Sequence, residues 1–164
     1  MKIITAILSL FLYQPGEAAP ISPHTLCGKH VQKIAQETNV PPEVIWAVAH
    51  AESNVGKLGP WPWTVNYKGA GYYFNSRKEM LAFIHKKAKG HRAINMDIGC
   101  MQLNFLYHGD KFTTIDEMTD IYKNMLIASQ YLRQLYEVNK REHTKLSEDR
   151  KSTRLNSSHQ IISY

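Results

Sequence analysis

The spacing of hydrophobic residues predicts a chain built mostly of helices. Apolar residues recur at helical intervals between positions 26 and 35, and the prolines of "NVPP" then end one helix and open the next. Residues 42–53 form a second predicted helix that is apolar almost all round, which is typical of a buried helix. Its last turn nevertheless carries an acid, Glu52.

A short β segment interrupts this helical pattern. Residues 55–75 are rich in glycine, proline and aromatic side chains, and within them "WTVNY" and "YYF" flank "KGAG". Two strand-forming runs around a glycine-containing turn predict a β-hairpin. The expected fold class is therefore mostly α, an α+β domain with a small β-hairpin excursion.

Two capping boxes predict the starts of later helices. Ser76 lies three residues before Glu79, ahead of an amphipathic run, and Thr114 lies three residues before Glu117, ahead of a helical period that continues to about Asn139. The segment between these helices, "AINMDIGCMQLNF", predicts a turn followed by one or two helical turns.

The two ends of the chain differ from this central domain. Residues 1–18 combine Lys2, the apolar run "IITAILSLFLY" and small residues before a cleavage point after Ala18, so we interpret them as a secretory signal peptide. Residues 149–164 have no hydrophobic period, and "DRKSTRLNSSH" is similar to the translation of a common sequencing adapter. We therefore expect an exported domain of residues 19–148, with a non-native tail at residues 149–164.

Charge and cysteine content narrow the class of protein. Sixteen basic and twelve acidic residues lie between positions 19 and 148, a net charge of +4 that is well below the charge of a nucleic-acid-binding surface. We expect no nucleic-acid partner, no transmembrane anchor in the mature chain, and a monomer. Because the protein is expected to be exported, its two cysteines, Cys27 and Cys100, predict a disulfide.

Glu52 is the first candidate for chemistry. Burial at the end of an apolar helix would disfavour its charged form and raise its pKa, as a general acid requires near neutral pH. A lone glutamate at a helix end also fits a plain structural role, in which it caps the helix, pairs with a lysine or reaches solvent. The choice between these roles needs support from another part of the chain.

A second motif supplies that support. "AESN" at residues 51–54 and "DIGCMQLN" at residues 97–104 resemble, in order and spacing, the signature motifs of the lytic transglycosylases of the lysozyme-like superfamily. The intervening "PWTVNYKGAGYYF" is similar to the branch found beside pili and secretion systems. The resemblance covers about residues 27–137. It implies a lysozyme-like fold that acts on peptidoglycan glycan strands, in the periplasm or secreted, with a pilus or secretion apparatus as an expected partner.

The resemblance also implies roles for individual residues. Glu52 would be the single catalytic acid and base that cleaves the β-1,4 bond after N-acetylmuramic acid and leaves a 1,6-anhydro product. Ser53 would support the carboxylate or the substrate, Gly99 would let the backbone approach the sugar, and Met101 would pack against an N-acetyl group. The other expected substrate contacts are Gln102, Asn104 and Tyr131, with Trp63, Tyr72 and Tyr73 as further aromatic contacts.

Several alternatives stay open at this point. Asp97 could activate water and make the protein a hydrolytic lysozyme, although a role in holding its turn through backbone N–H groups is favoured. A glycan-binding or assembly protein without catalysis is the alternative from another class. Met101 and Tyr131 could also be ordinary core residues. No metal or cofactor is expected, because the histidines lack ligand spacing.

The sequence also departs from the family at its C-terminal end. Relatives continue into a further tyrosine-containing motif and closing helices, which we expect to be missing here, and their loss could leave this truncated chain inactive. Relatives often have Asp-Pro where this chain has Asp120-Ile121.

Overall fold

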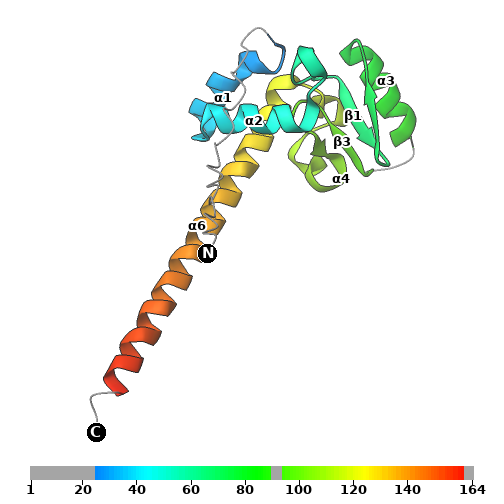
Figure 1. Ribbon diagram of the computed structural model, residues 1–164. Coiled ribbons are helices and arrows are strands. Elements are labelled where there is room, and N and C mark those ends of the chain that lie inside the picture. The colour runs from blue at the N-terminus through cyan, green and yellow to red at the C-terminus, as the bar shows by residue number, and fades with distance from the viewer. Residues whose placement is uncertain (1–24, 90–93, 161–164) are drawn as a thin grey trace, which may run out of the picture.

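The computed structural model describes residues 25–89 and 94–160. The predicted signal peptide, residues 1–18, lies outside the described residues. Helices surround a small antiparallel sheet, and one long helix extends away from the rest (Figure 1). The predicted fold class, mostly α with a small β excursion, is confirmed. No helix within the described ranges is long and apolar enough to cross a membrane.

The elements alternate between helices and short strands. The first half contains η1 (Gly28–His30), α1 (Val31–Thr38), α2 (Pro42–Ser53), η2 (Gly56–Leu58), β1 (Thr64–Tyr67), β2 (Ala70–Tyr73) and α3 (Arg77–Ala88). The second half contains β3 (Met96–Ile98), β4 (Leu103–Asn104), α4 (Phe105–His108), η3 (Gly109–Lys111), α5 (Ile115–Met118) and α6 (Ile121–Gln160).

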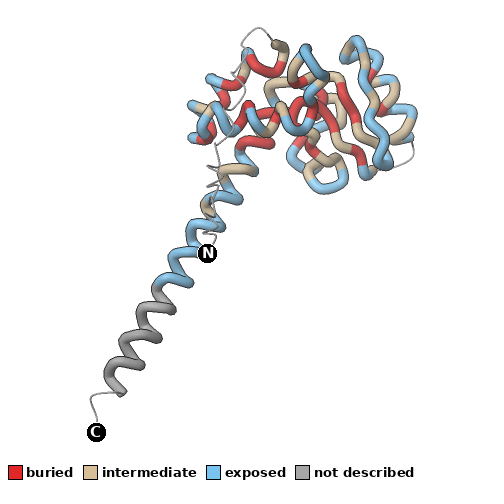
Figure 2. Tube along the Cα trace, viewed as in Figure 1, coloured by how far each residue is buried: buried red, intermediate tan, exposed pale blue. Residues whose placement is uncertain are grey.

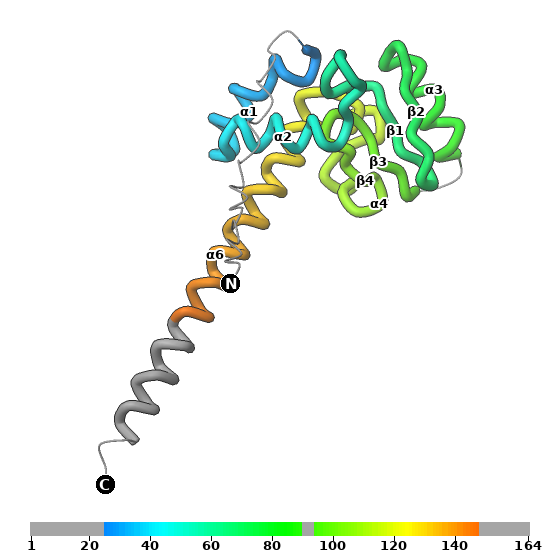
Figure 3. The backbone as a smooth tube through the Cα atoms, viewed as in Figure 1, coloured from blue at the N-terminus to red at the C-terminus, as the bar shows by residue number. Residues whose placement is uncertain are grey.

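The sheet has the strand order β2-β1-β3-β4, with every neighbouring pair antiparallel. Strands β1 and β2 form the predicted hairpin. The segment "AINMDIGCMQLNF" contains the predicted turn, at residues 99–102, and a helical turn that starts at Phe105, but the prediction missed the strands β3 and β4 on either side of the turn. The strands form here because the outer edge of β1 offers free backbone groups to β3, a long-range pairing that local sequence does not encode. Figure 3 shows the four strands in this order, with α3 beside them.

The pleat of the sheet separates an apolar face from a polar one. Val65 pairs with Tyr72 on one side and Ile98 on the other, so these three side chains share a face. The ring of Tyr72 lies 4.5 Å from that of Phe83 in α3, which covers this face. The opposite face carries polar side chains from β1, β3 and β4.

Helix α2 begins and ends at the predicted residues, but it is buried on one side only. Ile45, Trp46 and Ala49 belong to the core, whereas Val44, Ala47 and Ala51 are exposed. The expectation of a fully buried helix is therefore wrong. Hydrophobicity sets how much surface a helix can bury, but the elements packed against it decide how much it does bury.

Helix α6 packs its first turns into the core and then leaves the body of the protein (Figure 2). Met125 and Ala128 are buried, whereas no residue from Arg133 to Ser147 is. Against α1, the Tyr122 hydroxyl donates a hydrogen bond to Glu37, and this bond raises the pKa of Tyr122. The helix runs past its predicted end at Asn139 to Gln160. The hydrophobic period ends near Asn139 because burial ends there, whereas the backbone hydrogen bonds of a helix do not require burial and continue further along the chain.

The predicted disulfide between Cys27 and Cys100 is confirmed. Both residues are fully buried, and the bond joins positions 73 residues apart in sequence. Cys100 lies between β3 and β4, so the bond ties the start of the described chain to the turn that joins these strands.

We expect that replacing both cysteines by alanine lowers the free energy of unfolding by about 4 kcal/mol, because the cross-link no longer restricts the unfolded chain. Urea unfolding measures the difference. The native protein unfolded with a thiol reductant is the matched comparison and should lose a similar amount. An unchanged midpoint in both samples would contradict the assigned role of the bond.

Candidate functional site

Glu52 lies in the last turn of α2 and is exposed. The expected burial of its carboxylate is therefore wrong for the protein without a ligand. The buried stripe of α2 runs through Ile45, Ala49 and Ser53, so Glu52 flanks this stripe rather than belonging to it. Residues four apart on a helix share a face, which places Glu52 one turn beyond Val48 on the same side of α2.

Val48 lines a hollow between α2 and α6, which we call the α2–α6 hollow. Its volume is about 210 Å³. Four of the predicted substrate-binding residues line it, together with five others: Met101, Gln102, Asn104 and Tyr131, with Val48, Leu103, His108, Ala128 and Leu132. Glu52 is not in its lining. A second hollow of about 220 Å³ shares His108 and Tyr131 and continues along α6.

The larger hollow in the described part of the chain lies elsewhere. It has a volume of about 430 Å³ and is lined by residues near the end of α3 and around α4 and α5, such as His85 and Phe105. None of the predicted site residues lines it. The size of a hollow and the sequence motifs therefore indicate different places in this protein.

Ser53 links the end of α2 to the turn between β3 and β4. Its side chain is buried, and its Oγ donates to the Cys100 carbonyl oxygen at 2.7 Å and also lies 3.0 Å from the Ala49 carbonyl oxygen. In this arrangement the hydroxyl contacts backbone, so the expected support of the Glu52 carboxylate or the substrate is not seen. Ser53 instead fixes the position of Glu52 relative to the turn.

Gly99 and Gln102 shape this turn through left-handed backbone angles, with φ of +82° and +44°. A Cβ atom on Gly99 would lie 2.8 Å from Cγ of Asn124. The absence of a side chain at Gly99 is therefore needed for contact with a buried asparagine, and the expected approach of a sugar stays a prediction. The side-chain amide of Gln102 donates to the Gly99 carbonyl oxygen at 2.9 Å, which closes the turn on itself.

Asn104 and Asp97 hold each other across β3 and β4. The Asn104 amide nitrogen donates to Asp97 Oδ1 at 2.7 Å and to Asn95 Oδ1 at 2.6 Å, while its oxygen accepts from the backbone N–H of Leu106 at the start of α4. The favoured structural role of Asp97 agrees with this contact, although the partner is a side-chain amide and not a backbone N–H group.

The aromatic candidates divide into two groups. Tyr131 is 41% exposed and its ring lies 4.9 Å from that of His108, at the junction of the two hollows along α6. Trp63 packs edge-on against Trp61, and Tyr72 packs against Phe83, so both serve the fold. Tyr73 is exposed on β2, and none of Trp63, Tyr72 and Tyr73 lines the α2–α6 hollow.

Sequence reasoning missed two residues that matter here. His108 lines both hollows beside α6, and Asn124 is buried against the turn between β3 and β4. Asn124 could have been found, because it is a polar residue next to Met125 within the apolar period of a predicted helix. A buried amide requires hydrogen-bond partners.

Comparisons of this chain with protein-family models, with curated proteins and with solved structures gave no match. The functional argument therefore depends on the residues and geometry of the chain itself.

We expect Gly99→Ala to destabilise the protein more than Gly69→Ala. Both glycines have a positive φ, so alanine at either position costs about 1–2 kcal/mol in backbone strain. Only at Gly99 does the added methyl group meet a buried side chain, which adds roughly 1–3 kcal/mol. At Gly69 nothing lies within 4 Å. Urea unfolding of the two variants measures the difference, and equal losses would contradict the packing argument.

Proposed function

We propose that this protein is an exported lytic transglycosylase that cleaves peptidoglycan glycan strands. The observation that carries the proposal is the hydrogen bond from Ser53 to Cys100, because it joins the segment containing Glu52 to the segment containing Met101 and Gln102. This bond joins two motifs through residues that lie 47 positions apart in sequence, and the second motif lines the α2–α6 hollow with Met101, Gln102 and Asn104.

The chemistry requires one carboxylate that serves twice. Glu52 would first protonate the glycosidic oxygen that leaves N-acetylmuramic acid. It would then accept the proton of the 6-hydroxyl of that sugar as this oxygen bonds to the anomeric carbon. Ordinary glycosidases use two carboxylates, of which the second acts as nucleophile or activates water. The hydrogen bond between Asp97 and Asn104 supports a structural role for the other candidate acid.

Exposure of Glu52 suits a polymeric substrate. A general acid at an open surface is accessible to a long glycan strand, and the bound strand would remove water from the carboxylate when the reaction occurs. The lining of the α2–α6 hollow combines apolar side chains with amides, as sites that bind N-acetylated sugars require. Tyr131 adds an aromatic face on which a sugar ring can stack.

The setting of the reaction follows from the sequence resemblance. We propose export to the periplasm or beyond, and opening of the cell wall for a pilus or secretion apparatus. The disulfide between two buried cysteines supports an oxidising compartment.

We expect Glu52→Gln to lower the release of soluble muropeptides from purified peptidoglycan by at least about 100-fold, because glutamine cannot transfer the proton. Glu43→Gln is the matched control, since Glu43 is an exposed glutamate in the first turn of the same helix. This control should retain activity. Full activity of Glu52→Gln would refute the catalytic assignment.

Mass spectrometry of the products separates the proposed reaction from its closest alternative. Ends carrying 1,6-anhydro-N-acetylmuramic acid support a lytic transglycosylase, whereas reducing ends support a hydrolytic lysozyme. Binding of glycan strands without any cleavage would support a glycan-binding or assembly protein.

A further inference from the structure

Asn124 occupies an unusual position for an asparagine. It is 1% exposed and lies in the first turn of α6, where every polar atom of its side chain has a backbone partner. Its Oδ1 accepts from the N–H of Met101 at 3.1 Å, and its Nδ2 donates to the carbonyl oxygens of Ile98 and Met118 at 2.9 and 3.2 Å. A buried amide with this number of bonds is costly to remove, because its partners are then left unpaired.

Two of the three bonds of Asn124 hold the turn between β3 and β4, and the third goes to Met118 of α5. Ile98 ends β3 and Met101 lies inside the turn, so one side chain holds the turn at two points. Gly99 lies between these points and contacts the same amide closely. The backbone at Met101 therefore takes its position from Asn124, and Met101, which is 5% exposed and belongs to the hydrophobic core, also lines the α2–α6 hollow.

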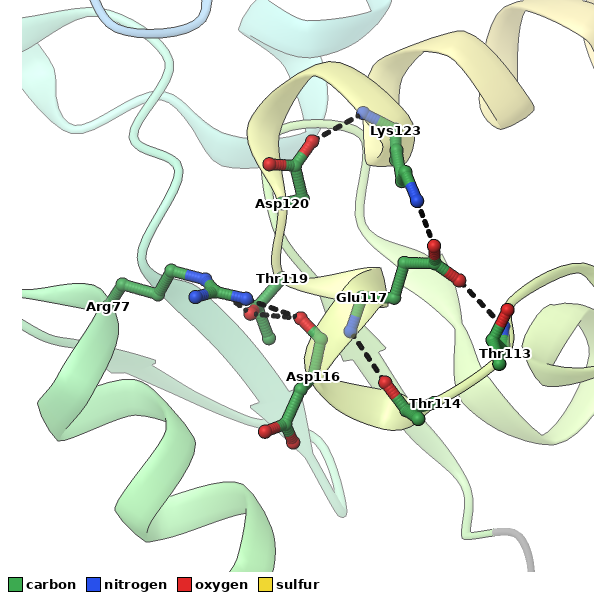
Figure 4. A network of polar contacts seen from close by, with 8 residues as sticks. All are labelled: Arg77, Thr113, Thr114, Asp116, Glu117, Thr119, Asp120 and Lys123. Carbon is green, nitrogen blue, oxygen red and sulfur yellow. Dashed lines mark hydrogen bonds and ion pairs between the residues drawn. The ribbon is translucent and has the colours of Figure 1, made fainter.

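Figure 4 shows a polar network that joins α3, α5 and the start of α6, next to Asn124 in sequence. Asp120 accepts from the backbone N–H of Lys123 at 2.9 Å, and its own carbonyl oxygen accepts from the N–H of Asn124 at 2.9 Å. Arg77 of α3 donates to Thr119 and to the carbonyl oxygen of Asp116 in α5. Arg77 thus ties the segment immediately before α6 to α3, and Lys123 in the first turn of α6 pairs with Glu117 of α5.

A separate contact, made by the residue after Glu52, connects the end of α2 to the same turn. Ser53 bonds to the carbonyl oxygen of Cys100, whereas Asn124 bonds to the N–H of Met101. Loss of the Asn124 amide would therefore move Met101 while leaving the Ser53 contact in place. The two connections divide the site into a part that carries the acid and a part that binds substrate.

We propose that Asn124 is a positioning residue that sets Met101 against the substrate in the α2–α6 hollow. The proposal rests on the proposed function for its substrate, the N-acetylated glycan strand. Asn124 does not touch the reacting atoms and acts through Met101. Its loss weakens substrate binding and leaves the acid chemistry of Glu52 largely unchanged.

The experiment compares Asn124→Ala, Met101→Ala and the double variant in steady-state cleavage of soluble peptidoglycan strands. We expect each single variant to raise KM by about tenfold while kcat changes by less than about threefold. We expect the double variant to show no further rise, because Asn124 acts through Met101. Ser129→Ala is the matched control, since Ser129 is buried in the same helix and its hydroxyl has no hydrogen-bond partner among the described residues.

A fall in kcat with KM unchanged, or rises in KM that multiply in the double variant, would overturn the proposal. If Asn124→Ala does not melt cooperatively, Asn124→Ser takes its place with the same expectations. Hydrogen exchange of the Met101 amide, measured without substrate, should accelerate in the Asn124 variant and not in Ser129→Ala.

The exchange measurement separates the two hypotheses. If the native protein neither cleaves nor binds glycan strands, the proposed function fails. The exchange rate of the Met101 amide then still tests whether Asn124 positions Met101. Accelerated exchange confined to the Asn124 variant supports the positioning role. Unchanged exchange overturns it.

Discussion

The buried amide of Asn124 is the contact on which the candidate site depends. An asparagine in the core needs partners for one acceptor and two donor positions, and here the backbone of Ile98, Met101 and Met118 supplies them. The turn between β3 and β4 needs a partner equally, because a two-residue strand such as β4 contributes few hydrogen bonds of its own. The Asn124 amide and the backbone of the turn therefore supply each other's hydrogen-bond partners. Gly99, with its positive φ and no side chain, leaves room for the Asn124 amide.

Three other parts of the chain converge on the same turn. Ser53 at the end of α2 donates a hydrogen bond to the Cys100 carbonyl oxygen, and Cys27 forms a disulfide with Cys100. The carbonyl oxygen of Thr64 in β1 accepts from the N–H of Gly99. The result is a rigid segment between two helices, with an exposed acid at one side and an open hollow beside it. Under the proposed function, this geometry would suit a long substrate that approaches from solvent, because Glu52 and the hollow would lie in place before the substrate arrives.

Local features of the fold could be predicted from the sequence because their causes are local. Pro42 opens α2, Ser76 caps α3 by accepting from the Glu79 N–H, and Thr114 caps α5 in the same way. The hairpin followed from its turn residues, and the disulfide from the expected compartment. Strand β3 could not be predicted in this way, because its pairing partner β1 lies about thirty residues earlier in the chain, and β4 pairs with β3 alone.

The sequence by itself determined the starts of α2, α3 and α5, the hairpin, the pair of cysteines and four of the residues that line the α2–α6 hollow. Tertiary structure alone decided what those residues do. It turned Ser53 and Gln102 toward backbone, assigned Gly99 to a contact with Asn124, and left Glu52 exposed at the edge of a helix buried on one side. The physical reason is that hydrogen bonding and burial are set by neighbours distant in sequence, whereas propensity and capping are set within a few residues.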